Sequence, residues 1–371
     1  MNAMLDIIRS RFSPTIYELP ITRDYCRHWG FREAIRELLQ NAIDSDSEFD
    51  CRFGNQGDTN TVVISSEGVT LPASTLLLGN TSKANDDSSI GNFGEGYKIA
   101  MLVLLRAGYG VQVCNGDHDW VPAFGMSPVF KTEVLQIHET PKIDGDNSLR
   151  FMITGLSHDD ILAVRDSCLQ LQAENYTDLV KHQTRYGDIL RDHKNKLYVG
   201  GLYVCDTELD FGYNIKPEFL RLERDRQTVS SFDLKWLTKD MWFDTSEYNF
   251  IATMVDTDVP DIQYANHGTP ELVREACYRL FCEKYPGAVA ASSQADLEAK
   301  IRHGMTTVIV HERMSEVLAN HTPYTSVTVV RVSPPIDILE TWLRDNRRNI
   351  NRKANDNFKA LIATSRNWKL K

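Results

Sequence analysis

Two stretches of the sequence, separated by a long polar segment, constrain what this chain can fold into. The first, residues 32–46, reads RELLQNAIDSD over its last eleven positions, and the second, residues 89–106, reads SIGNFGEGYKIAMLVLLR. In the first stretch apolar residues recur at helical spacing, so one stripe can be buried while Glu37, Asn41 and Asp44 share another face. The pattern predicts a helix with one polar, acidic face.

The polar face of this helix carries residue types that suit phosphate chemistry. Residues one turn apart on a helix lie about 5–6 Å from each other. Glu37 can therefore hold a water molecule while the side-chain carbonyl of Asn41 coordinates a magnesium ion that bridges phosphates. The alternative is an amphipathic surface helix whose Glu and Asp side chains are simply solvated.

The second stretch combines a glycine-rich loop with an apolar segment that is hydrophobic nearly all round and indicates a buried helix. Glycines let backbone N–H groups approach phosphate oxygens, and a helix N-terminus adds a favourable partial charge. Lys98, in the first turn, can reach the same anion. The spacing fits neither a Rossmann fingerprint nor a P-loop. The loop residues assigned to a nucleotide site are Gly91, Phe93, Gly94 and Gly96.

Taken together, the two stretches resemble the nucleotide site of the GHKL superfamily. The ATP-binding domain of that superfamily, the Bergerat fold, is shared by gyrase, the ninety-kilodalton heat-shock chaperones, MutL and sensor kinases. The resemblance implies that ATP and Mg²⁺ are cofactors, that Glu37 activates water and that Asn41 is the metal ligand. It also implies that Asp44 supports the base end of the nucleotide and that the chain forms a homodimer during its cycle.

One segment departs from the family pattern. After a strand predicted at 61–65, the family has D-x-G-x-G, whose Asp accepts a hydrogen bond from the adenine amino group. This chain has Ser66-Glu67-Gly68-Val69-Thr70. Ser66 or Glu67 could accept that bond, a water molecule could relay it, or base selectivity is altered. Gly68 still supplies the turn.

Residues 76–89, LLLGNTSKANDDSS, resemble the lid of the same family, with an apolar start and a polar loop. The triplet ending at Lys83 is similar to the T-S-K of MutL lids, in which the lysine approaches phosphate. A solvated loop lysine is the alternative. Lids of this kind close over bound nucleotide and exclude water.

The element pattern predicts an α+β chain of three domains. Residues 1–160 are expected to form a two-layer α/β sandwich, the Bergerat fold, with an N-terminal extended arm. Further strands are predicted at 110–114, 120–124, 129–138 and 149–154.

Residues 161–270 are expected to form a connector and a chaperone-like middle domain. Residues 160–193 are predicted to be a helical connector, and residues 197–210 a strand pair with a Gly turn. The segment FLRLERDRQ resembles the L-x-L-x-R-E segment of the ninety-kilodalton heat-shock chaperones, whose arginine reaches the terminal phosphate. Arg224 matches that arginine and Arg226 is its neighbouring candidate, whereas a salt-bridged surface run is the alternative.

Residues 271–371 are expected to form a small, largely parallel α/β unit with a basic C-terminus. Helices are predicted at 269–285, 294–303, 312–319 and 335–344, and strands at 288–292, 306–310 and 326–332.

Composition limits the classes of function. The net charge is −10, but residues 341–371 carry +7, which leaves −17 on the preceding 340 residues. The basic end favours either nucleic-acid binding or docking on the acidic remainder of the protein. Seven cysteines without a C-x-x-C pair argue against a disulfide framework. With no run of eighteen apolar residues and no secretory leader pattern, a cytoplasmic protein without a membrane segment is expected.

The first functional hypothesis is therefore a magnesium-dependent ATPase that works as a conformational clamp, chaperone-like or associated with DNA maintenance or defence. The second, from another class, is a non-catalytic scaffold built on a degenerate nucleotide fold, or a nucleic-acid-associated module that uses its basic end.

Overall fold

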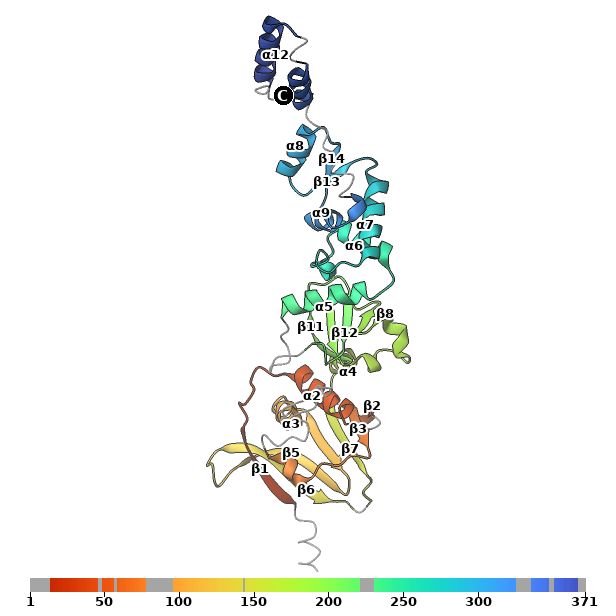
Figure 1. The fold of residues 1–371 in the computed structure, drawn as a ribbon. Helices are drawn as coiled ribbons and strands as arrows, with labels where there is room; N and C mark the ends of the chain where they lie inside the picture. Colours follow the sequence, from red (N-terminus) through yellow and green to blue (C-terminus); the bar gives the residue numbers. More distant parts are fainter. Residues whose placement is uncertain are drawn as a thin grey trace, which may run out of the picture. The chain divides into compact units, whose positions relative to one another are not determined.

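The computed structural model describes residues 14–45, 49–56, 59–77, 96–142, 144–220, 230–324, 335–346 and 350–365. The chain divides into two compact units, residues 1–230 and 231–371 (Figure 1). The predicted α+β class is confirmed, since helices combine with largely antiparallel sheets. The expected domain boundaries after residues 160 and 270 stay predictions.

The first unit is built on an antiparallel sheet whose seven described strands run in the order β1-β6-β5-β4-β7-β3-β2. The strands that were predicted all form, with β1, the expected extended arm, pairing with β6. Strand β2 was not predicted. The bounds are β1 Thr15–Thr22, β2 Phe49–Gln56, β3 Thr59–Glu67, β4 Gly110–Asn115, β5 His118–Met126, β6 Glu133–Pro141 and β7 Ser148–Leu156.

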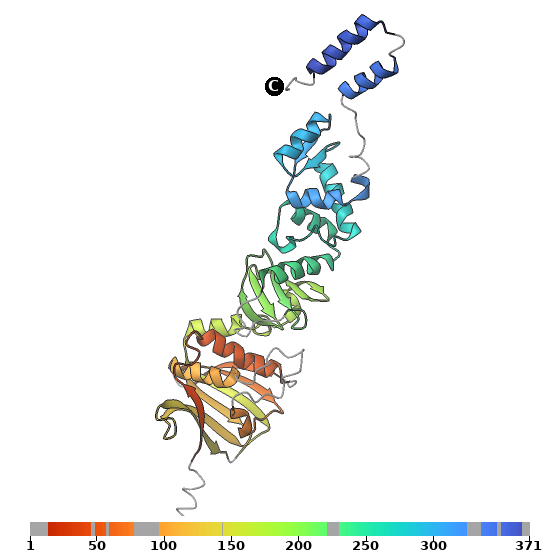
Figure 2. The ribbon, with the colours of Figure 1, turned by 60° about the vertical axis from the view of Figure 1, so that its left-hand side comes forward.

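Two helices, α2 (Phe31–Ile43) and α3 (Gly96–Arg106), lie side by side over one face of this sheet (Figures 1 and 2). Helix α2 buries the apolar stripe that its spacing predicted. Helix α3 is buried nearly all round, as its composition predicted. The two helices and the sheet share one hydrophobic core, which includes Ile35, Leu39 and Leu102.

Arg106 joins the end of α3 to the connection between β1 and α2. Its guanidinium donates to the carbonyl oxygens of Arg23, Tyr25, Cys26 and Trp29 at 2.9–3.2 Å. Four acceptors satisfy most of the five donors of an arginine, so this contact orders the chain immediately before α2.

The predicted helical connector at 160–193 is wrong over most of its length. Helix α4 (His158–Asp166) is followed by short 3₁₀ turns and then by strands β8 (Val180–Thr184) and β9 (Gly187–Leu190). Ser157 caps α4 and Ser167 ends it. The apolar residues that suggested a longer helix, among them Cys168 and Leu169, are instead buried where the chain turns back.

Strands β8 and β9 belong to a second sheet in the order β11-β10-β12-β9-β8. The predicted strand pair at 197–210 is confirmed as β10 (Lys196–Val199) and β11 (Leu202–Asp206). Strand β12 (Gly212–Ile215) runs parallel to β10. An isolated bridge between Cys168 and Leu202 attaches this sheet to the core of the first.

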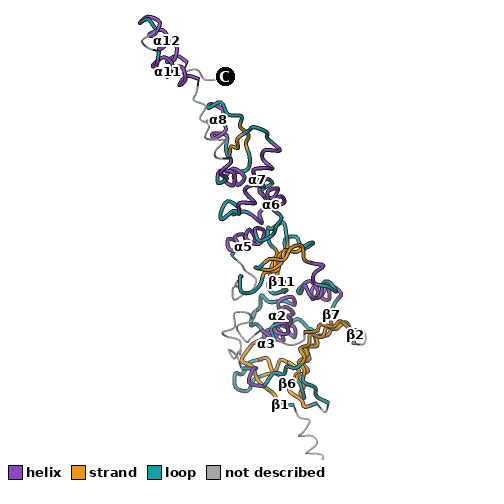
Figure 3. The backbone as a smooth tube through the Cα atoms, turned by 45° about the vertical axis from the view of Figure 1, so that its right-hand side comes forward, coloured by secondary structure: helices purple, strands orange, loops and turns teal. Residues whose placement is uncertain are grey.

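The second unit is mostly helical (Figure 3). Its predicted helices at 269–285, 294–303, 312–319 and 335–344 all form, and β13 and β14 pair in parallel as expected. The strand predicted at 326–332 lies outside the described residues. The bounds are α5 Ser231–Phe243, α6 Tyr248–Asp256, α7 Glu271–Lys284, β13 Val289–Ala291, α8 Gln294–Arg302, β14 Thr307–Ile309, α9 Glu312–Ala319, α11 Pro335–Asp345 and α12 Arg352–Ser365.

Candidate functional site

The candidate site lies where the polar face of α2 meets the first residue of α3. Glu37 is 1% exposed, although it belongs to the polar face of its helix. A Cβ atom added to Gly96 would collide with Oε2 of Glu37 and lie 3.2 Å from its Cδ and 3.6 Å from Nδ2 of Asn41. The carboxylate, the amide and the helix-opening glycine therefore occupy one small volume.

Local interactions orient the acid and the amide. Nδ2 of Asn41 donates to the main-chain carbonyl of Glu37 at 2.6 Å, which directs the other amide atom, Oδ1, to act as an acceptor. Nη2 of Arg36 lies 3.8 Å from Oε1 of Glu37, and both side chains are more than nine-tenths buried. The sequence did not point to Arg36, because a charged residue directly before Glu37 matches no recognised motif.

Asp44 and Ser66 lie at the opposite end of α2 from its start. Asp44 is the residue that ends the helix, and its N–H donates to Gln40 at 2.8 Å. The next residue, Ser45, approaches the hydroxyl of Ser66 in β3 at 3.4 Å. Ser66 is buried at this position. The hydroxyl of Ser66 thus lies beside the C-terminal end of the helix that carries Glu37.

Gly68 follows β3 directly and has φ +75°, a conformation that favours glycine. Its N–H donates to the carbonyl of Asn147 at 2.7 Å. The glycine therefore terminates β3 and turns the chain against the start of β7.

Lys98, which was assigned to the nucleotide site, lies in the first turn of α3. Its side chain is fully buried, and Nζ donates to the carbonyl oxygens of Thr75 at 2.6 Å and Leu77 at 2.5 Å. Tyr97 donates to the same Thr75 carbonyl at 2.8 Å. A buried ammonium needs such acceptors, so Lys98 anchors the segment that precedes residue 78 to the start of α3.

The other residues assigned to the nucleotide site, Lys83, Gly91, Phe93, Gly94 and Arg224, lie outside the described residues. In the part of the chain that the structure describes, no three His, Cys, Asp or Glu side chains converge as a metal site. Over the same residues, no helix has the length and apolar character needed to cross a membrane.

Comparison with known proteins gives a distant relative. No family model matches the chain. A protein of Mycoplasma pneumoniae, described as an uncharacterized protein, is 28% identical over 218 residues, which cover 54% of this chain and 86% of that protein.

Proposed function

We propose that this chain is a GHKL-type ATPase whose first unit contains a Bergerat-type ATP-binding fold. The observation that carries the proposal is the convergence of Glu37, Asn41 and Gly96 at the junction of α2 and α3. A side chain in place of Gly96 would force the Glu37 carboxylate to shift.

The donor set suits a magnesium ion that arrives with its nucleotide. Mg²⁺ is commonly held by one or two protein oxygens together with substrate phosphates and water, so a site with few protein ligands fits this role. Asn41 Oδ1 is the protein oxygen proposed to bind it. Bound Mg²⁺·ATP would supply the transferable phosphoryl group and a counter-charge for its oxygens.

Glu37 is the proposed general base, which orients a water molecule and accepts its proton. Its burial excludes bulk water from the carboxylate, and the guanidinium of Arg36 lies 3.8 Å from it. The N-terminus of α3 offers a positive dipole end for a phosphate. Arg224 is proposed to contribute a second positive charge, beside Mg²⁺, to the phosphate oxygens during turnover.

Binding and hydrolysis are tested separately. Calorimetry with Mg²⁺ and ATP, ADP or GTP measures affinity, and phosphate release measures turnover. We expect ATP to bind and to be hydrolysed slowly, and turnover to fall in Arg224→Ala at nearly unchanged ATP affinity. Absence of binding by all three nucleotides would refute the proposal. Light scattering with and without ATP tests the proposed homodimer.

The hydroxyl pair of Ser45 and Ser66 favours a second candidate function, a non-catalytic nucleotide-binding scaffold. A hydroxyl can either donate or accept, so it discriminates adenine from guanine less strictly than a carboxylate does. A non-catalytic nucleotide-binding scaffold would bind ATP and GTP with similar affinity and would show no turnover that depends on Glu37.

A further inference from the structure

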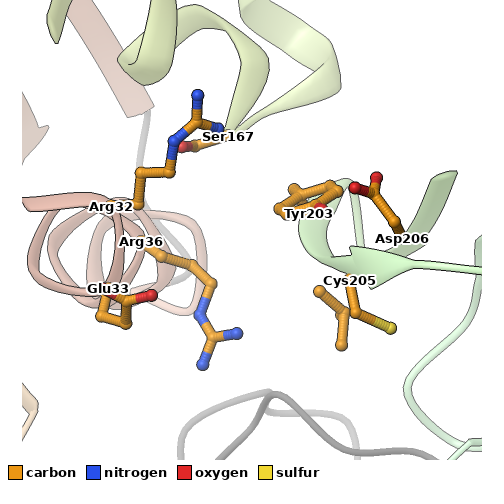
Figure 4. A pocket seen from close by; sticks show the side chains of 8 residues that line it. Arg32, Glu33, Arg36, Ser167, Tyr203, Cys205 and Asp206 are labelled. Atoms are coloured by element: carbon orange, nitrogen blue, oxygen red, sulfur yellow. The ribbon is translucent and has the colours of Figure 1, made fainter. Parts of the chain in front are cut away.

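A separate cavity of about 300 Å³ lies on another side of α2, within the first unit. Helix α2 forms one wall and strand β11 the opposite one, as Figure 4 shows, and Ser167 comes from the end of α4. This volume is at the lower end of the range for small-molecule sites. The lining residues are Arg32, Glu33, Arg36, Ser167, Tyr203, Val204, Cys205 and Asp206.

Main-chain hydrogen bonds join the β11 wall of the cavity to the segment that follows α4. The N–H of Tyr203 donates to the carbonyl of Ser167 at 3.0 Å, and the N–H of Leu169 donates to Gly201 at 2.9 Å. Leu202 and Ile35, one from each wall, belong to the same buried core. The cavity is therefore a built part of this unit.

The two arginines give one wall a positive character. Arg32 and Arg36 are one turn apart on α2, and Figure 4 shows Arg32 extending toward Ser167 and Arg36 extending to the other side of the cavity. Arg36 is buried, whereas Arg32 is exposed at the rim. Among the described residues Arg32 forms no ion pair within 4 Å. The two guanidinium groups therefore border the cavity at different points, and each suits an oxygen of a carboxylate or a phosphate.

The two carboxylates of the lining already accept hydrogen bonds from the protein. Glu33 accepts from the N–H of Gly30 at 2.8 Å and so caps α2. Asp206 accepts from the hydroxyl of Tyr203, and this bond together with burial raises the pKa of Tyr203. Burial likewise raises the pKa of the Cys205 thiol, so at neutral pH β11 contributes a neutral phenol and a neutral thiol to the lining of the cavity.

We propose that this cavity binds a small molecule whose carboxylate or phosphate group lies against the positive wall formed by Arg32 and Arg36, while its remainder lies against Tyr203, Val204 and Cys205. Asp206, at the rim, accepts a hydrogen bond from a hydroxyl group of the ligand. The ligand class is thus a small hydroxylated anion.

The position of Arg36 connects this cavity to the candidate site. The same guanidinium lines the cavity and lies 3.8 Å from Glu37. An anion that binds the guanidinium of Arg36 competes with the carboxylate of Glu37 for that positive group. Resting on the proposed function, the ligand therefore regulates hydrolysis by changing the electrostatic environment of the base.

The binding step is tested without ATP, by thiol protection. N-ethylmaleimide modification of Cys205 is followed by peptide mass spectrometry at pH 8.5 in the full-length protein. The probes are inorganic phosphate, glycerol 3-phosphate and L-malate, with sodium chloride at equal ionic strength as the reference. Half-buried Cys114 in β4, which does not line the cavity, is the internal control.

We expect at least one probe to slow Cys205 modification about fivefold or more at several times its Kd while Cys114 is unaffected. Which probe protects best distinguishes a phosphate from a carboxylate ligand. Arg32→Met should abolish protection, and because Arg32 is exposed this variant should fold normally. Arg52→Met, an exposed arginine outside the cavity, should retain it.

Equal Cys205 rates with all three probes and with chloride would overturn the proposal, as would full protection in Arg32→Met. The regulatory step has its own readout, the effect of the protecting probe on ATP turnover. If a probe protects Cys205 but the protein has no ATPase activity, the anion site is supported and the proposed ATPase function is refuted.

Discussion

Gly96 begins α3 directly against the carboxylate of Glu37, in space that a methyl group cannot share with it. This contact brings together two segments that are separated by more than fifty positions in the sequence. Replacing Gly96 with alanine should displace Glu37, cost about 1–3 kcal/mol in free energy of unfolding and weaken ATP binding. Urea unfolding and calorimetry measure the two effects.

Gly54 in β2 is the matched control for that substitution. A Cβ there would meet only Oγ1 of Thr61 at 3.5 Å, an ordinary contact. Gly54→Ala should therefore leave ATP affinity unchanged. If both alanine variants behaved alike, the close approach of Gly96 to Glu37 would have no functional meaning.

Glu37→Ala should retain nucleotide binding and lose hydrolysis. A general base contributes about 10²–10⁴-fold to a rate, so turnover should fall by at least a hundredfold while the Kd for ATP changes little. Phosphate release under saturating ATP measures the loss. Glu33→Ala, one turn earlier on the same helix, removes a cap and should lower stability with turnover preserved. Full turnover in Glu37→Ala would exclude Glu37 as the base.

Lys98→Met separates a structural lysine from a phosphate-binding one. Loss of the ammonium leaves the carbonyls of Thr75 and Leu77 without this donor, which should cost about 1–3 kcal/mol in free energy of unfolding. Tyr97→Phe, which loses a neutral donor to Thr75, should cost less. A variant of normal stability with weakened ATP binding would instead show that Lys98 acts on phosphate.

Stability should fall at alkaline pH. Burial raises the pKa of Cys51 to about 12 and that of Cys168 to about 11, against about 9 for a free thiol. The folded state therefore keeps these protons while the unfolded state releases them, so this stabilisation is complete below about pH 9 and is lost progressively above it. Urea unfolding from pH 8 to 11 measures the slope, and Cys51→Val should reduce it.

Sequence reasoning found the elements whose periodicity is strong and local. The apolar stripe of α2 and the nearly uniform apolarity of α3 predicted both helices, and the parallel pair in the second unit followed from alternation of helix and strand. Strand β2, FDCRFGNQ, is polar and contains a glycine, so its own residues do not indicate a strand. It forms because it pairs with β3.

The helical connector failed for a related reason. Apolar residues at helical spacing continue past Asp166, but the chain leaves the helix at Ser167 and buries Cys168 and Leu169 against β11 and the second sheet. Tertiary contacts there override local periodicity. The cavity between α2 and β11 could not be predicted from the sequence either, because its lining residues are far apart in the sequence and are brought together by tertiary packing.

The four carbonyls gathered by Arg106 give the first unit a mechanical property. The guanidinium of Arg106 joins the end of α3 to the loop that precedes α2. The two helices are therefore connected at the end of α3 that lies farthest from Gly96. If the proposed nucleotide moves the start of α3, the contacts of Arg106 connect that helix to the end of β1 at the sheet's edge, where Arg23 pairs with Glu133 of β6.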